Sequence, residues 1–306
     1  MKVPRVVVVG DLLYDLLARV DGNVRLGVDT FTPIRAAGGG SGANAASWLA
    51  ASGVETHFVG RIGDDVFGEF LGTDLGDAGV NAHLARDPSL ATGKVLVLVD
   101  GDVERTMITD RGAVESLDPR DLPRPIFDGG HLHLVGYTFS GGSRRETAFE
   151  ALRLACEAGM TVSVDPSAVP MLEDVGPERF LAWTRGADLC FPNLEEGSLL
   201  AGKEDPDQIA ENLLELYPAV VLKLGARGAL YADAKGRRSR VSAEQVRVAD
   251  TTGAGDALCA GFLSAWIAGA APEEALRRGV GTAARAVEIV GGRPGAYRER
   301  SRKNLR

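Results

Sequence analysis

The chain has 306 residues, of which 45% are hydrophobic and 25% charged, and its formal net charge is −8. The length allows a large buried core, and the composition is typical of a soluble globular protein. The acidic balance argues against nucleic-acid binding, because a nucleic-acid binder needs basic clusters to neutralise phosphates.

Three scattered cysteines fit neither a disulfide framework nor a zinc site: Cys156, Cys190 and Cys259. A reducing cytoplasm is therefore the expected location. No signal segment and no membrane association are expected, because the apolar run 6–9 is short and no run reaches transmembrane length. His131 and His133 would share one face of a strand, and with no third ligand nearby we expect them to be packing residues.

Short apolar runs along the chain predict buried strands at residues 6–9, 57–60, 95–99, 131–135, 161–164, 189–191 and 220–224. Helical patterns lie between many of them, at residues 42–52, 67–78, 143–158, 207–216 and 254–268. This alternation predicts a mainly parallel sheet covered by helices on both faces. Such sheets bind ligands at the carboxyl ends of their strands.

Two stretches depart from this alternation. Residues 15–32 are rich in turn residues, and residues 95–113 alternate around Gly101-Asp102. The second stretch predicts a hairpin in which 94–100 pairs with 103–109. We expect the two stretches to form a small antiparallel sheet that projects from the main body.

Residues 38–46 form the first of two glycine-rich segments, Gly-Gly-Gly-Ser-Gly-Ala-Asn-Ala-Ala. Its Gly40-x-Gly42-x-x-Ala45 pattern satisfies the dinucleotide-binding fingerprint, which needs a buried strand directly before the glycines. Residues 32–37 make a poor strand, so a Rossmann-type dehydrogenase is disfavoured. A nucleotide-binding P-loop is excluded, because its Gly-x-x-x-x-Gly-Lys-Ser/Thr pattern does not occur.

The second glycine-rich segment is 250–256, Asp-Thr-Thr-Gly-Ala-Gly-Asp, which directly precedes the apolar stretch 257–268. Gly253 and Gly255 let the backbone approach a ligand, and the free N–H groups of a first helical turn attract an anion. Asp256 adds a carboxylate beside that anion site, which indicates a base for phosphoryl transfer to a hydroxyl. On the local pattern alone, a buried helix start with a first-turn carboxylate is an equally good interpretation.

Segment 250–256 resembles the C-terminal signature of the ribokinase-like (PfkB) small-molecule kinases, and 38–46 resembles their N-terminal signature Gly-Gly-x-x-x-Asn-x-Ala. Three further segments match in the family's order, at 191–196, 223–228 and 290–296. The resemblance implies one kinase domain over residues 1–306, folded as a three-layer α/β sandwich with a mainly parallel central sheet. It also implies a β lid formed by roughly 15–32 and 94–113, which closes over the sugar and in several family members pairs two subunits into a homodimer.

The resemblance also implies the site residues. The catalytic base would be Asp256, beside an anion hole at Gly253, Ala254 and Gly255. The sugar would be bound by Asp15, by glycines that let the backbone approach it, and by an amide: Gly39, Gly40, Gly42 and Asn44. ATP would contact Asn193, Lys223, Gly225, Arg227, Gly228 and Gly255. Mg²⁺ would be organised by Asn193 and Glu196, and K⁺ would be bound at Asp250, Thr252, Val290, Arg293 and Gly295.

Without the resemblance, three of these positions have simpler interpretations. Asp15 would cap a turn, and residues 193–196 would start a helix with an N-cap and an acidic first turn. Residues 223–228 would form a hairpin turn.

Two departures from ribokinases bear on the substrate. Ser41 stands where ribokinases carry Lys, and Gly136 stands where they carry Glu. A glycine at 136 is expected to leave space and Tyr137 to offer a stacking face, which suits a larger sugar, a sugar acid or a nucleoside. If Arg105 and Arg111 face inward, they suit a carboxylate or phosphate; we expect at least one of them to be solvated.

The expected function is ATP-dependent phosphorylation of a primary hydroxyl of a small sugar or sugar derivative, with Mg²⁺ and K⁺. Nucleoside kinase is the alternative within the same family. A non-catalytic sensor on the same fold is disfavoured, because Asp256, Asn193 and Glu196 are all present. As a carboxylate at a helix N-terminus, Asp256 is expected to have a lowered pKa and to be a weak base.

Overall fold

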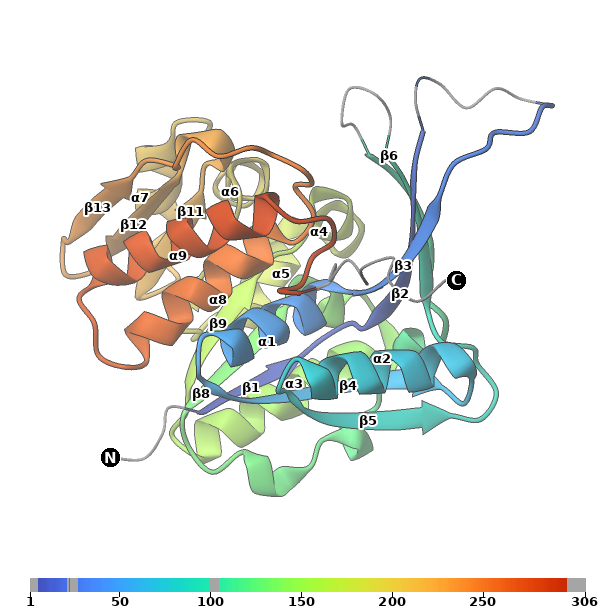
Figure 1. Ribbon diagram of the computed structural model, residues 1–306. Coiled ribbons are helices and arrows are strands. Elements are labelled where there is room, and N and C mark those ends of the chain that lie inside the picture. The colour runs from blue at the N-terminus through green and yellow to red at the C-terminus, as the bar shows by residue number, and fades with distance from the viewer. Residues whose placement is uncertain (1–4, 21, 23–26, 100–104, 296–306) are drawn as a thin grey trace.

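The computed structural model describes residues 5–20, 22, 27–99 and 105–295. A nine-stranded sheet lies between two layers of helices, and a separate four-stranded sheet, called here the small sheet, rises from one side (Figure 1). The predicted α/β architecture is confirmed. Among the described residues, no helix is both long and apolar enough to span a membrane.

The main sheet has the strand order β13-β12-β11-β10-β9-β8-β1-β4-β5. Neighbouring strands from β5 to β11 are parallel, and the last two pairings, β11–β12 and β12–β13, are antiparallel. The strands are β1 Arg5–Val9, β4 Glu55–Gly63, β5 Asn81–Asp87, β8 His131–Val135, β9 Thr161–Asp165, β10 Leu189–Cys190, β11 Ala219–Lys223, β12 Ala229–Asp233 and β13 Arg238–Val241. The predicted strands within this sheet are confirmed, and β5, β12 and β13 are additional strands.

Apolar side chains on the two faces of this sheet form two core clusters. One face packs against α1 Ser41–Ala51, α2 Val66–Asp77, α8 Ala254–Trp266 and α9 Pro272–Val287. The other packs against α3 Gly142–Glu157, α4 Val169–Val175, α5 Pro177–Thr184, α6 Leu194–Ala201 and α7 Pro206–Leu213. Because β1 alternates its valines between the two clusters, both faces of the sheet are covered.

The two histidines of β8 are packing residues, as predicted. Both are buried, and His131 Nε2 and His133 Nδ1 lie 2.7 and 2.8 Å from Ser163 Oγ. Burial lowers the pKa of His131 to about 3 and that of His133 to about 4, so both rings are neutral near pH 7.

The small sheet has the order β3-β2-β6-β7, formed by β2 Leu13–Arg19, β3 Ile34–Gly39, β6 Lys94–Val99 and β7 Arg105–Asp110. β2–β3 and β6–β7 are antiparallel pairs, and β2–β6 is parallel. The predicted hairpin is present, but its register differs by one residue: Lys94 lies opposite Asp110, where the predicted pairing would place Thr109. The predicted turn at Gly101-Asp102 lies outside the described residues. β3 was not predicted, and because it belongs to the small sheet, the glycines after it do not follow a buried parallel strand.

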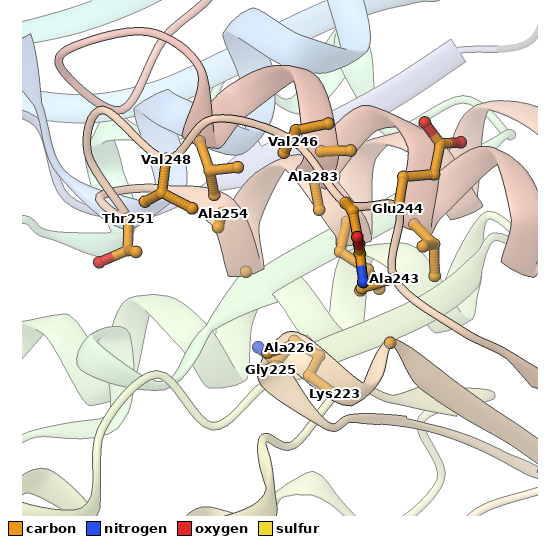
Figure 2. Close-up of a pocket in the computed structure, with 17 residues that line it drawn as sticks. Lys223, Gly225, Ala226, Ala243, Glu244, Val246, Val248, Thr251, Ala254 and Ala283 are labelled. Carbon is orange, nitrogen blue, oxygen red and sulfur yellow. The ribbon is translucent and has the colours of Figure 1, made fainter.

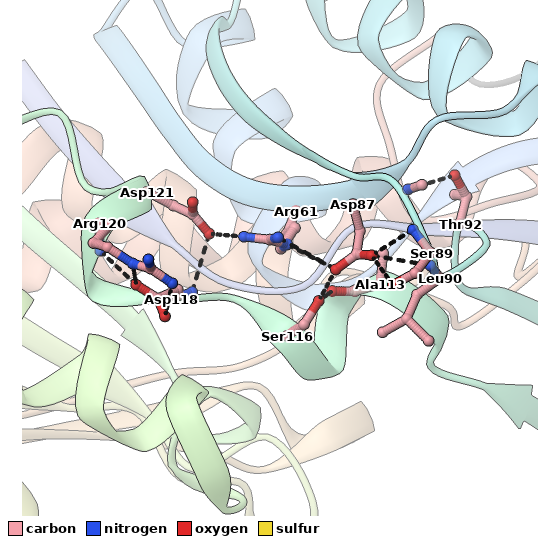
Figure 3. Close-up of polar contacts among 11 residues, drawn as sticks. Arg61, Asp87, Ser89, Leu90, Thr92, Ala113, Ser116, Asp118, Arg120 and Asp121 are labelled. Carbon is pink, nitrogen blue, oxygen red and sulfur yellow. Dashed lines mark hydrogen bonds and ion pairs between the residues drawn. The ribbon is translucent and has the colours of Figure 1, made fainter.

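A polar network fixes the base of the small sheet where β6 leaves the main body (Figure 3). Asp87, at the end of β5, accepts hydrogen bonds from Ser116 Oγ and from the backbone N–H groups of Ser89 and Leu90. These bonds hold the pKa of Asp87 well below its usual range. Arg61 bridges Asp87 and Asp121, so the segment that follows β7 is attached to the main sheet.

Candidate functional site

The candidate site lies where the carboxyl ends of β1, β8, β9 and β11 meet the first turns of α1, α6 and α8. This edge brings together Asp11 after β1, Tyr137 after β8, Asp165 at the end of β9 and Lys223 at the end of β11. Parallel strands deliver such residues to one edge although they are far apart in the chain.

Asp256 lies in the first turn of α8 and is held by two side chains of α1. Ser41 Oγ donates to Asp256 Oδ1 at 2.7 Å, and Asn44 Nδ2 donates to Asp256 Oδ2 at 3.0 Å. Burial, with a further contribution from Asp165, nevertheless raises the pKa of Asp256 to about 7. The prediction of a weak base with a lowered pKa was therefore wrong: desolvation outweighs the helix dipole and the two hydrogen bonds.

The turn before Asp256 has two glycines with different surroundings. Gly253 has φ +71°, and a Cβ built there would lie 2.6 Å from Gly292 Cα. A Cβ on Gly255 would meet only the Lys223 ammonium, with its nearest atom, Nζ, at 3.4 Å. Gly253 is thus required by its backbone conformation and by the nearby Gly292, whereas a side chain at Gly255 would contact only Lys223.

A pocket of about 710 Å³ opens on this turn. Figure 2 shows Lys223, Gly225 and Ala226 on one side and Val246, Val248, Thr251 and Ala254 on the other. Gly228 and Gly255 also line it, so four of the predicted nucleotide contacts lie together; Arg227 is exposed and is not part of this lining. The wall at 243–248, where Val246 and Val248 line the pocket together with Glu244 and Gln245, was not predicted, because that segment has no motif.

Lys223 is buried and forms an ion pair with Asp165, with Nζ 2.7 Å from Oδ2. Cys259 Sγ lies 3.2 Å from the same oxygen. Burial alone would lower the pKa of Lys223, but Asp165 and its neighbours raise it, so the ammonium stays charged. Sequence reasoning missed Asp165, whose only signal was its place at the end of a predicted buried strand.

Asn193 and Glu196 form a reciprocal cap on α6. Asn193 Oδ1 accepts from Glu196 N, while Glu196 Oε2 accepts from Asn193 N and Glu196 Oε1 accepts from Asn193 Nδ2. The capping interpretation from sequence is thus confirmed. Glu196 is 1% exposed, and burial together with Asp165 raises its pKa to about 7.

The carboxylates at this edge outnumber the cation beside them. Glu196, Asp165 and Asp256 all interact electrostatically with one another and with Lys223. When ionised, these carboxylates exceed the charge of one ammonium, and this excess suits a hard divalent cation such as Mg²⁺. Among the described residues, however, no group of three acidic, histidine or cysteine side chains is placed to ligate an ion directly, so the excess charge could attract Mg²⁺ only through its waters.

The predicted sugar contacts lie around Asp15 on β2. Asp15 is buried, its Oδ1 has no hydrogen-bond partner among the described residues, and burial raises its pKa to about 7. The glycines beside it lie close to other protein atoms. A Cβ on Gly39 would lie 2.2 Å from Asp15 Oδ2, one on Gly40 2.6 Å from Asp11 O, and one on Gly42 2.8 Å from Gly10 Cα. Their missing side chains make room for protein atoms.

The last loop packs against the 250–256 turn. Asp250 Oδ1 accepts from Thr252 N and Oγ, and Asp250 Oδ2 accepts from Gly291 N at 2.9 Å. Val290 is half-buried and Gly295 exposed, whereas Arg293 is buried. The two segments predicted to share a monovalent cation are therefore adjacent.

Two of the substrate predictions are corrected by the structure. Gly136 leaves no space, because a Cβ there would lie 2.1 Å from Pro166 O. Tyr137 does not offer an open stacking face, because the Arg111 guanidinium lies 4.5 Å from its ring centroid. Arg105 begins β7, but its side chain lies outside the described residues.

Comparisons with known proteins agree on one family. A model described as pfkB family carbohydrate kinase matches residues 3–297. The fructokinase of Klebsiella pneumoniae is 33% identical over 276 residues, covering 87% of this chain and 85% of the relative. The ATP-dependent ribose-1-phosphate kinase of Halopiger xanaduensis is 32% identical over 278 residues, covering 89% and 88%. The solved structure of adenosine kinase from Sinorhizobium meliloti superposes with a TM-score of 0.87 at 25% identity, covering 96% of both chains.

Proposed function

The chain belongs to the pfkB family of carbohydrate kinases, and on this premise we propose that it transfers the γ-phosphoryl group of ATP to a primary hydroxyl of a small sugar or sugar derivative. The observation that carries the proposal is the position of Asp256. Its carboxylate, with a pKa of about 7, stands at the first turn of α8 beside an open glycine turn and a buried ammonium. A base with a pKa near the working pH both ionises and accepts a proton readily.

ATP occupies the pocket between 223–228 and 243–248. The apolar wall around Val246 and Val248 takes the base, and the γ-phosphate lies at the N–H groups of the Gly253–Gly255 turn. Lys223 faces Gly255 across this position and offsets the phosphate charge. Backbone N–H groups at a helix start and a fixed ammonium are pre-organised for an anion.

When bound, Mg²⁺ stabilises the charge that develops on the transferred phosphoryl group. Asn193 and Glu196 hold the ion at the edge of the sheet, largely through its waters. A cation bound there would favour the ionised form of Glu196, whose carboxylate accepts the two hydrogen bonds from Asn193.

Asp256 accepts the proton of the substrate hydroxyl as that oxygen attacks phosphorus in line, and ADP leaves with the bond electrons. Ser41 and Asn44 hold one carboxylate oxygen each, so the carboxylate cannot rotate away from the hydroxyl. The unpartnered Oδ1 of Asp15 accepts further hydroxyl groups of the sugar, which supports its role in substrate selection.

A charged sugar is the best-supported substrate class. Arg111 lies 3.7 Å from Glu115, which forms a shorter 2.6 Å pair with Arg144, so the charge of Arg111 is only loosely balanced. A carboxylate or phosphate on the substrate would balance it. A nucleoside is the second candidate, favoured by the match to an adenosine kinase structure; a non-catalytic sensor is the least supported.

The remaining parts of the proposal concern ions and assembly. Asp250, Thr252 and the carbonyls of Val290, Arg293 and Gly295 would hold a K⁺ ion, which would orient the anion-hole turn. Residues 1–306 act as one kinase domain whose small sheet closes as a lid and pairs two subunits. The three cysteines are free, in keeping with action in the cytoplasm.

The test is ADP release with Mg-ATP against fructose, ribose, 2-dehydro-3-deoxygluconate, ribose 1-phosphate and adenosine, each in K⁺ and in Na⁺. Turnover of a charged sugar is expected, faster in K⁺, and Arg111→Gln should lower kcat/KM about 10- to 100-fold for that sugar alone. Turnover of only neutral sugars or adenosine would contradict the proposal that the substrate is a charged sugar. No turnover of any compound, with ATP still bound, would contradict the kinase proposal for this panel.

A further inference from the structure

The side chain of Arg293 is enclosed between three parts of the candidate site. Arg293 is 2% exposed. Its Nε donates to Asn44 Oδ1 at 3.3 Å, its Nη2 donates to Gly39 O at 2.6 Å, and its Nη1 pairs with Asp74 Oδ2 at 2.5 Å. Sequence reasoning placed only the backbone carbonyl of Arg293 at the site. The guanidinium instead joins the last loop to α1, α2 and β3.

The contact with Asn44 determines which way its amide points. An asparagine amide has one accepting and one donating end, and the two ends exchange when the side chain flips. On one side of Asn44 stands Arg293, which can only donate; on the other stands Asp256, which accepts when ionised. Both neighbours favour the same orientation, with Oδ1 toward Arg293 and Nδ2 toward Asp256.

The surrounding backbone packs closely on both side chains. A Cβ on Gly38 would lie 2.2 Å from Arg293 Nη1, and one on Gly292 would lie 2.4 Å from Asn44 Nδ2. Trp48, one turn after Asn44 on α1, donates from Nε1 to Gly292 O at 2.9 Å. This bond is a separate attachment of the loop, and it does not involve the Asn44 amide.

We infer that Arg293 is a positioning residue for phosphoryl transfer: it holds the Asn44 amide so that Nδ2 donates to Asp256, and it holds the Gly39 carbonyl beside Asp15. This inference rests on the proposed role of Asp256 as the base. Arg293 itself does not reach Asp256, so its effect on turnover passes through Asn44. Misplacing a catalytic group by about 1 Å can cost up to about 10²-fold in rate.

The test is a double-mutant cycle on kcat with Arg293→Lys and Asn44→Ala. Lysine keeps the charge opposite Asp74, but a single ammonium cannot span all three acceptors as the planar guanidinium does. Arg293→Lys alone should lower kcat about 10- to 100-fold, and in the Asn44→Ala background it should lower kcat less than about threefold. Trp48→Phe is the matched control: it loosens the same loop at Gly292 without touching the amide, and its kcat should stay within about threefold of wild type.

A second readout does not depend on the substrate. The side-chain amide of Asn44, identified in ¹⁵N spectra by its absence in Asn44→Ala, should shift in Arg293→Lys and stay in place in Trp48→Phe. Equal losses of kcat from Arg293→Lys in both backgrounds, or an unmoved Asn44 amide, would overturn the inference while leaving the kinase proposal intact. A shifted amide in an enzyme without turnover would instead confirm the contact and remove the catalytic role of both residues.

Discussion

At the scale of single residues, the sequence was sufficient to predict which residues form the site, whereas their pKa values could not be predicted. Sequence motifs identified Asp256, Asn44 and Glu196, and the structure places all three at one edge of the sheet. Their surroundings come from chain segments far away. The pKa of Asp256 is raised to about 7 by burial and by Asp165, which lies 91 positions earlier in the chain. No local pattern around residue 256 contains that information.

The raised pKa of Asp256 makes a prediction for the pH dependence of turnover. The base must be ionised to accept a proton, so kcat/KM should fall about tenfold per pH unit as the pH drops below about 7. A base with the ordinary aspartate pKa would keep its activity to about pH 4. The measurement is kcat/KM between pH 5 and 9 at saturating Mg-ATP.

Asp15 and Glu196 also titrate near pH 7, so a control is needed. The residual activity of Asp256→Asn supplies this control. Below pH 7, the slope of log kcat/KM against pH should be smaller by one in this variant than in wild type, because one titrating proton has been removed. An unchanged slope in that variant would assign the titration to another carboxyl group.

At the scale of elements, the two glycines of the 250–256 turn look equivalent in sequence and differ in the fold. Gly253 adopts the left-handed region, with φ +71°, and abuts Gly292. Gly255 faces the nucleotide pocket. The same holds for 38–46, where sequence predicted an approach of backbone to ligand and the structure fills the space with Asp15, Asp11 and Gly10. A glycine motif indicates where the backbone packs closely, but it does not show whether a ligand or another part of the chain lies there.

Alanine at these two positions should therefore have opposite consequences. Gly253→Ala should destabilise the fold by about 1–3 kcal/mol, because it meets both the strained backbone and Gly292. Gly255→Ala should leave the melting temperature nearly unchanged and raise KM for ATP, because its Cβ enters the space beside Lys223. Thermal unfolding and ATP titration of both variants test this; a large loss of stability in Gly255→Ala would contradict it.

At the scale of the whole molecule, alternation of apolar runs and helical patterns was sufficient to predict a mainly parallel sheet. Two of the strands that were not predicted lie where periodicity is weak. β5 is an edge strand with few buried positions, and β3 is short and rich in glycine and alanine. Their places depend on pairing with β4 and β2, which is decided by tertiary contacts.

The small sheet carries exposed apolar side chains, and we predict that two subunits pair through it. Ile34 and Ile108 lie on one face of it and are 64% and 59% exposed, whereas Met107, 50% exposed, lies on the other face. Burying such a patch against a second copy would remove it from water. Light scattering after size exclusion should give the mass of a dimer, and Ile108→Glu should shift it to the monomer; a monomeric wild type would contradict lid pairing.

The most direct test of the central claim is the turnover number of Asp256→Asn against wild type, measured as ADP release with the substrate found in the panel. If Asp256 is the base, kcat should fall by about 10²–10⁴-fold, with ATP affinity and melting temperature little changed. Near wild-type turnover in a folded, ATP-binding Asp256→Asn enzyme would contradict the assignment of Asp256 as the base.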